Sequence, residues 1–246
     1  MKKNILIDVA TSSWPQPSAV PPEFVSGTQE MDLGSAFLML GTLTMPDILS
    51  PASPARFWAW LRYFMAPART GDLRITMDFA DLDPHQKGIL SDDFGVALST
   101  QWLFDRFGGF ADIVDGRRFI LQFAHLLPNK TKPVTAKVGP TKAPDFVIKD
   151  LRGRWHVLEC KGTQSGRAAR NRSLDDALAQ KQVIQIIGGL RGERLAAGLS
   201  LSNERSKDLT ELRVVDPEGE SLIELGESQS DEIDMAARRI EPVPVV

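Results

Sequence analysis

The chain has 246 residues, of which 42% are hydrophobic, so it can bury one sizeable core, and a largely disordered protein is excluded. Its single cysteine, Cys160, excludes an intramolecular disulfide framework and a multi-cysteine zinc site, and a reducing, cytoplasmic location is expected. The formal net charge of −3 hides a segregation, because residues 129–181 hold twelve Lys and Arg against five Asp and Glu. This basic segment suits either a solvated, loop-rich surface or a contact with a polyanion.

Residues 1–87 are expected to form an N-terminal accessory region, either a separate domain or additional elements packed on the core. The apolar run at residues 4–9 is interrupted by Asp8, which is too early for a secretion signal. This segment is therefore expected to be a strand. The later apolar stretch, residues 36–49, is too short to cross a bilayer, so no membrane span is predicted. The Trp- and Phe-rich segment 55–65 is expected to be helical.

Residues 88–225 are predicted to form the main domain, and the acidic tail, residues 226–246, is predicted to be mobile. The first helix of this domain is expected to begin at a cap on Ser91 or Asp92 and to end at a Gly-Gly pair, residues 108–109. After it, the segment FADIVDGRRFILQF predicts one bent strand or a hairpin that turns at Asp115-Gly116.

Residues 144–161 contain two apolar runs around a DLRG turn and predict a β-hairpin. A Gly-, Ser- and Arg-rich loop then leads to a helix that is expected from about Ser173, as N-cap, to residue 187. Residues 195–201 and 212–215 predict two further strands. The predicted order is therefore helix, three strands, helix and strand, which is an α/β arrangement.

The predicted hairpin brings chemically active residues together. Side chains alternate along a strand, so Glu159 and Lys161 project from the same face, and the turn can place Asp145 beside Glu159. Carboxylates are preferred ligands of Mg²⁺ or Mn²⁺, and Asp145, Glu159 and the backbone carbonyl of Cys160 are sufficient protein ligands for such a cation. Lys161 can orient or deprotonate a water and offset charge on a phosphate. This grouping suits the hydrolysis of a phosphodiester.

The same residues carry a resemblance to a known family. Pro144-Asp145, followed at a suitable distance by Glu159-Cys160-Lys161 in an apolar strand, resembles the signature of the PD-(D/E)XK, or restriction endonuclease-like, nuclease superfamily. The resemblance implies a core of helix, three-stranded meander, helix and strand. It also implies a Mg²⁺-dependent DNA endonuclease, with DNA favoured over RNA on the resemblance alone. Such a nuclease could serve in restriction or anti-phage defence, in mobile-element processing or in repair, and defence is the role expected.

Members of this superfamily often carry a further acidic residue on the first helix, usually Glu. This chain has no Glu between Glu30 and Glu159, so Asp93 is chosen for that role over Asp92 and Asp105. Simple capping of the helix by Asp92 and Asp93 is the alternative. On the second helix, Gln180 is expected either to support the site from the inward face or to be an ordinary surface residue.

Three arginines, Arg167, Arg170 and Arg172, follow the lysine strand in the loop before the second helix. At least one of them is expected to contact the DNA backbone, because a loop at a helix N-terminus is suited to phosphate binding. The chain would then be a nuclease, alone or as a homo-oligomer, or a non-catalytic module that binds nucleic acid or a partner. The segment from Phe57 to Phe64 suits either core packing or contact with an ATPase, helicase or recognition subunit.

Overall fold

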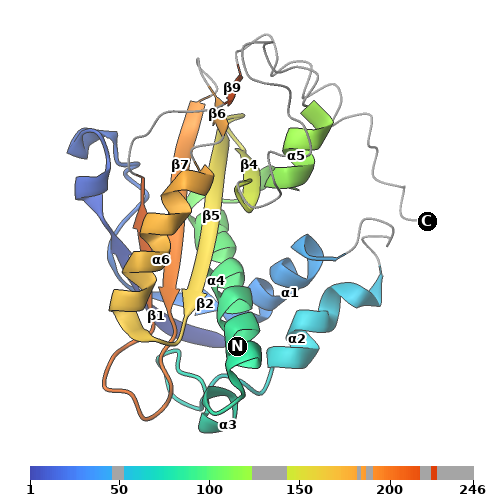
Figure 1. The fold of residues 1–246 in the computed structure, drawn as a ribbon, viewed down its shortest axis with the longest axis vertical. Coiled ribbons are helices and arrows are strands. Elements are labelled where there is room, and N and C mark those ends of the chain that lie inside the picture. Colours follow the sequence, from blue (N-terminus) through green and yellow to red (C-terminus); the bar gives the residue numbers. More distant parts are fainter. Residues whose placement is uncertain (46–52, 124–142, 182–183, 187–190, 217–222, 226–246) are drawn as a thin grey trace.

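The computed structural model of the chain shows a mixed α/β protein built on a twisted sheet with helices on both faces (Figure 1). It describes residues 1–246 except 46–52, 124–142, 182–183, 187–190, 217–222 and 226–246. The strands are β1 (Lys2–Val9), β2 (Gly27–Asp32), β3 (Phe110–Asp115), β4 (Phe146–Asp150), β5 (Trp155–Thr163), β6 (Ile184–Ile186), β7 (Arg191–Ser200), β8 (Glu211–Val215) and β9 (Ile223–Leu225). The α-helices are α1 (Leu33–Leu43), α2 (Trp58–Tyr63), α3 (Met77–Ala80), α4 (Pro84–Phe107), α5 (Gly116–Phe123) and α6 (Gly166–Lys181). Short 3-10 helices are η1 (Thr11–Ser13), η2 (Pro17–Ala19) and η3 (Pro54–Phe57).

Seven strands form one sheet in the order β2-β1-β8-β7-β5-β4-β3, and β6 pairs with β9 separately. Strands β3, β4 and β5 form an antiparallel meander, and β5 runs parallel to β7 after the chain has passed through α6. Strand β8 pairs antiparallel with β7 and parallel with β1. The predicted succession of helix, three strands, helix and strand is therefore present as α4, β3–β5, α6 and β7.

The N-terminal region belongs to the same sheet as the hairpin. Strand β1 has an alternating buried pattern and pairs with β8, so Ile5 and Ile7 enter the common hydrophobic core. The predicted boundary between residues 87 and 88 falls inside α4. Of the two predicted alternatives, the structure therefore shows residues 1–87 as additional elements packed on a common core and not as a separate domain.

The sheet separates two helical layers (Figure 1). Helix α4 packs on β5 and β7 from one side, with α1 against α4, and Phe94 and Leu98 of α4 are completely buried there. Helix α6 covers the same two strands from the other side through Leu174 and Ala177. The middle strands are therefore buried on both faces, as continuous apolar strands in parallel pairing usually are.

Helix α4 begins earlier than the sequence analysis predicted. Asp83 is its N-cap and accepts hydrogen bonds from the backbone N–H groups of His85 and Gln86, and Pro84 fills the first helical position. Asp92 therefore lies in the middle of the helix and cannot cap it. The predicted end is confirmed, because Gly108 adopts the left-handed conformation with φ of 70°.

The segment after α4 also differs from the prediction of a bent strand or a hairpin. Only Phe110–Asp115 is extended, and α5 starts at Gly116. Asp115 Oδ1 accepts a hydrogen bond from the Arg118 N–H at 2.8 Å, so this carboxylate satisfies a free donor in the first turn of α5. The Asp-Gly pair, which suits a hairpin turn, here begins a helix.

The hairpin itself is confirmed, and its turn is held by one carboxylate. Asp150, 2% exposed, accepts hydrogen bonds from the Arg152 and Arg154 N–H groups at 2.9 and 2.8 Å. Its Oδ2 pairs with Arg154 Nε at 2.8 Å and lies 3.2 Å from Nε2 of the buried His156. Gly153, with φ of 82°, supplies the left-handed residue that closes the turn. The register of β4 and β5 is thereby fixed.

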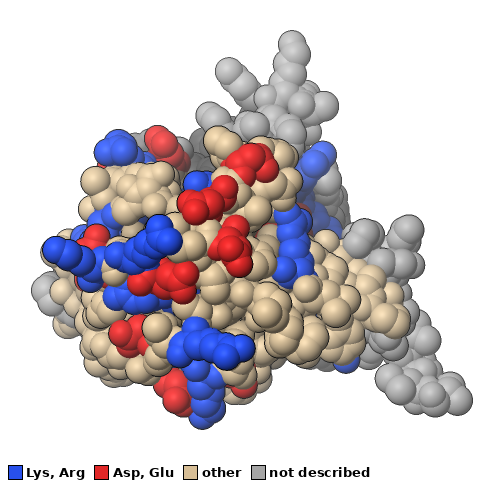
Figure 2. All heavy atoms as spheres, turned by 90° about the horizontal axis from the view of Figure 1, so that it is seen from below, with Lys and Arg blue, Asp and Glu red and all other residues tan. Residues whose placement is uncertain are grey.

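Of the predicted basic segment, residues 129–142 lie outside the described residues, as do the predicted tail, residues 226–246, and His125. On the face shown in Figure 2, Lys and Arg side chains are interspersed with Asp and Glu. Among the described residues, no helix combines the length and the apolar character needed to span a bilayer.

Candidate functional site

The hairpin brings Asp145, Glu159 and Lys161 together. Phe146 lies opposite Leu158, so Asp145, one residue before β4, meets β5 beyond the last paired residue. Its Oδ2 accepts a hydrogen bond from the Cys160 N–H at 2.7 Å, and its own N–H donates to Glu159 Oε2 at 3.1 Å. Lys161 Nζ donates to Glu159 Oε1 at 2.5 Å. Two carboxylates and one ammonium group thus share one edge of the sheet.

Burial sets the charges at this site. The side chain of Glu159 is 1% exposed, and burial together with the negative charge of Asp145 raises its pKa to about 7. Burial likewise raises the pKa of Asp145. Burial alone would lower the pKa of Lys161, but the charge of Glu159 and the hydrogen bond to it raise that pKa above its usual value. Lys161 is therefore a cation at neutral pH, and one cation faces two carboxyl groups.

Helix α4 directs Asp92 toward this site. The predicted acidic residue, Asp93, is its neighbour in the sequence and points elsewhere. The Tyr63 hydroxyl of α2 donates a hydrogen bond to Asp93 Oδ2, which turns Asp93 toward α2. Burial raises the pKa of Asp92, while the charge of Lys161 and the N–H of Gly162 act in the opposite direction. Asp92 thus faces the end of β5 that carries Lys161.

Two glycines allow α4 to approach β5 closely enough for this contact. A Cβ atom at Gly162 would lie 1.7 Å from the carbonyl oxygen of Ser91, and one at Gly95 would lie 2.8 Å from the carbonyl group of Lys161. Both obstacles are backbone atoms, which cannot rotate away. Helical spacing in the sequence could have identified Asp92. It lies three residues before Gly95, and Ser99 lies four residues after Gly95, so all three share one face of the helix.

We expect Gly95→Ala and Gly88→Ala to change stability in opposite directions, although both substitutions lie in α4. At Gly95 the added methyl group collides with Lys161 backbone, so the free energy of unfolding should fall by about 1–3 kcal/mol. At Gly88 nothing lies within 4 Å, so the higher helix propensity of alanine should raise it by about 0.5–1 kcal/mol. Urea unfolding monitored by circular dichroism measures both. Equal effects of the two substitutions would contradict the close approach.

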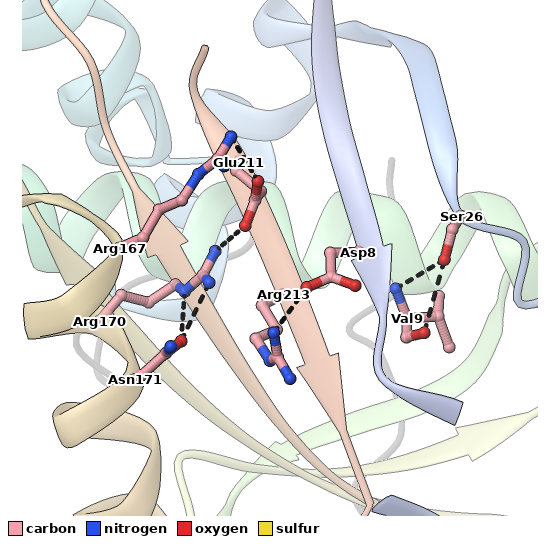
Figure 3. A network of polar contacts seen from close by, with 8 residues as sticks. All are labelled: Asp8, Val9, Ser26, Arg167, Arg170, Asn171, Glu211 and Arg213. Carbon is pink, nitrogen blue, oxygen red and sulfur yellow. Dashed lines mark hydrogen bonds and ion pairs between the residues drawn. The ribbon is translucent and has the colours of Figure 1, made fainter. Parts of the chain in front are cut away.

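The three arginines lie in the first two turns of α6, because this helix begins at Gly166 and not near Ser173 as predicted. Figure 3 shows Arg167 and Arg170 both directed at Glu211 of β8. Arg167 Nη2 lies 2.7 Å from Glu211 Oε2, and Arg170 is 2% exposed and also donates to Asn171 Oδ1 at 3.0 Å.

This network anchors α6 to the sheet. A buried guanidinium that is already paired has no surface to offer a phosphate, so the structure does not place Arg170 at a nucleic-acid interface. Arg167 is half-exposed, and Arg172 is exposed on the same helix. For Arg167 and Arg172, contact with a DNA phosphate stays a prediction. A neighbouring ion pair, Arg213 Nη1 to Asp8 Oδ2 at 2.8 Å, joins β8 to β1 (Figure 3).

The remaining candidates are less closely tied to the site. Gln180 lies in α6, but its side chain falls outside the described part of the chain. Asp105 hydrogen-bonds to Gln101 near the far end of α4. Asp115 was not a candidate, yet its negative charge contributes to the raised pKa of Asp145, so it lies near the site. Asp115 is the last residue of β3 and lies opposite Phe146, the residue that follows Asp145.

The oxygen atoms of the site suit a hard divalent cation. Within the described residues, no three His, Cys, Asp or Glu side chains form a ready cage for a metal ion. The donor set is therefore the two carboxylates of Asp145 and Glu159, with the peptide of Cys160 directly beside them. Mg²⁺ usually binds to one or two carboxylates and keeps several waters, and its charge would offset the burial and the repulsion by Asp145 that raise the pKa of Glu159.

Comparisons of the chain with protein-family models, with curated proteins and with solved structures found no match.

Proposed function

We propose that this protein is a metal-dependent nuclease that hydrolyses phosphodiester bonds in DNA with Mg²⁺ or Mn²⁺. The observation that supports the proposal is the meeting of Asp145, Glu159 and Lys161 at one edge of the sheet, with both carboxylates hydrogen-bonded into the hairpin. Two carboxylates can hold a divalent cation, and a neighbouring lysine can offset charge on a phosphate, which together suit this chemistry.

The arrangement of elements supports a restriction endonuclease-like core for this nuclease. Helix α4, the antiparallel strands β3–β5, helix α6 and the parallel strand β7 follow one another in the order that the resemblance implies. The proposed core spans α4 to β7 and carries its reactive residues on β5 and at the start of β4. Strands β1 and β2 then extend the sheet on the far side of β8.

Each residue has a separate task in the proposed reaction. Asp145 and Glu159 would hold the cation, with the backbone carbonyl of Cys160 as a third ligand. When bound, such a cation neutralises the phosphate and makes a water molecule more acidic. Lys161, 28% exposed and a cation, can donate hydrogen bonds to the attacking water or to a phosphate oxygen as negative charge develops there. This favours the role of charge stabiliser over that of base. Asp92 would position the ammonium group of Lys161.

A cleavage assay on supercoiled and linear DNA tests the proposal. We expect the purified protein to produce nicked or linear products in Mg²⁺ or Mn²⁺ and none in EDTA, and Asp145→Ala should be inactive. Binding without cleavage, equal in EDTA and in Mg²⁺, would contradict the proposal and indicate a non-catalytic binding module. A role in restriction or anti-phage defence, alone or with an ATPase, helicase or recognition subunit, is proposed on the resemblance alone.

A further inference from the structure

An exposed aromatic surface lies on η3 and α2. Its rings are Phe57, Trp60 and Phe64, which are 40%, 38% and 48% exposed. Two flexible apolar side chains, Leu61 and Met65, flank the rings and are 71% and 64% exposed. These five residues make up most of the large apolar side chains that are exposed in the described part of the chain. Such a concentration on one short segment marks an interaction surface.

The opposite side of α2 explains why the rings stay outside. Ala59 and Tyr63 are buried, and Tyr63 packs against Phe37 and Phe94 at ring-centroid distances of 6.0 and 5.5 Å. This inward side satisfies the core, so ordinary packing accounts for Tyr63 but not for the aromatic surface. On the outer side, Trp60 and Phe64 stack with centroids 5.0 Å apart and planes at 27°. The two rings thus support each other by stacking, and both remain partly exposed to solvent.

The charge around the rings favours an anionic partner. Residues 53–71 contain three arginines, Arg56, Arg62 and Arg69, and no Asp or Glu. The guanidinium of Arg56 lies 5.1 Å from the centre of the Phe57 ring. Aromatic faces beside arginines are the combination that binds unpaired bases and their phosphates.

The aromatic surface is coupled to the candidate site through α4. Tyr63 hydrogen-bonds to Asp93, and the adjacent Asp92 faces Lys161. On the same helix, Gln86 accepts a hydrogen bond from Arg62 at 2.7 Å. Helix α2 is thus fixed to the part of α4 that reaches the site. The aromatic surface is therefore carried by a helix that packs on the same α4 from which Asp92 reaches the site.

We propose that Phe57, Trp60 and Phe64 form a stacking surface for the unpaired bases of a single-stranded nucleic acid segment. Bases stack on aromatic side chains largely regardless of their identity, because every base has a flat face. One consequence of this inference rests on the proposed nuclease function: the preferred substrates would be those with a single-stranded segment. The binding itself does not require cleavage.

The test is the affinity for a fluorescein-labelled oligothymidylate, measured by fluorescence anisotropy in EDTA. The double variant Trp60→Ala/Phe64→Ala should bind about ten- to a hundredfold more weakly than the unchanged protein. Leu61→Ala/Met65→Ala is the matched control, since it removes exposed apolar groups from the same short segment without removing a ring, and its affinity should be unchanged. The duplex of the same oligonucleotide should bind equally to all three proteins.

Two outcomes would overturn the inference. Unchanged affinity of the ring variant would show that the rings do not stack on bases. An equal loss in both double variants, or a change of oligomeric state in both, would indicate an apolar interface with a protein instead. Unchanged affinity of the ring variant together with Mg²⁺-dependent cleavage would refute this inference and leave the proposed function standing. Ring-dependent binding without cleavage would support this inference and contradict the proposed nuclease function.

Discussion

Replacing Lys161 with alanine should lower the rate of Mg²⁺-dependent DNA cleavage by about 10²–10⁴-fold and leave the fold intact. The Lys161 ammonium group donates to Glu159 at 2.5 Å and is the one positive side chain that the hairpin places directly at the two carboxylates. Its removal takes away the donor that, in the proposed reaction, would stabilise charge on the phosphate. Because 28% of this side chain is exposed, a cavity in the core is not created.

Lys149→Ala is the matched control for this experiment. Lys149 lies on the same hairpin, with its Nζ over the ring of Trp155 at 5.4 Å and away from Asp145 and Glu159. Its loss removes one positive charge from the same element and should change the cleavage rate by less than about threefold. Equal rates for Lys161→Ala and the unchanged protein, or equal losses in the two variants, would exclude the assigned role of Lys161.

Replacing Glu159 with glutamine should alter the pH dependence of stability in the absence of metal ions. The folded pKa of about 7 lies above the usual 4.5, so the folded state binds the extra proton between these values. Glu159 therefore stabilises the fold below pH 4.5, and this contribution is lost as the pH rises through 7. Relative to the unchanged protein, Glu159→Gln should gain about 3 kcal/mol in free energy of unfolding over that window.

Glu193→Gln separates a general effect of burial from a metal site. Burial also raises the pKa of Glu193 to about 7, but this side chain accepts a hydrogen bond from Trp14 Nε1 at 3.0 Å on another part of the sheet. Both variants should show the same change with pH in urea unfolding. Added Mg²⁺ should raise the melting temperature of the unchanged protein and of Glu193→Gln, but not of Glu159→Gln. A Mg²⁺ response retained by Glu159→Gln would contradict its assignment as a ligand.

The sequence was sufficient for the hairpin and its reactive pair. Alternation along a strand fixes Glu159 and Lys161 on one face regardless of the tertiary context. The position of Asp145 depended on the length of the turn, and the turn is set locally by Asp150 and Gly153. The pairing of β4 with β5 follows from the same short turn, whereas about thirty residues, α5 among them, separate the end of β3 from the start of β4.

The features that were missed depend on contacts between distant segments. The start of α4 was misplaced because Ser91 and Asp92 resemble a cap, whereas the real cap is Asp83 followed by Pro84. Which of Asp92 and Asp93 faces the site depends on Tyr63, thirty residues earlier in the chain.

The role of Arg170 likewise depends on Glu211 of β8, which lies 41 residues further along the chain. The inclusion of β1 and β2 in the sheet required the pairing of β1 with β8, which is about 200 residues further along the chain. Such pairings leave no local signature in the sequence.

The dependence of the plasmid-cleavage rate on Mg²⁺ concentration, compared between the unchanged protein and Asp145→Asn, tests the central claim most directly. Asparagine keeps the size of the side chain and its hydrogen bond from Cys160 but removes the charge that would hold the cation. We predict that Asp145→Asn needs a much higher Mg²⁺ concentration and reaches a rate at least about a hundredfold lower. Superimposable curves for the two proteins would show that the chemistry does not take place at Asp145.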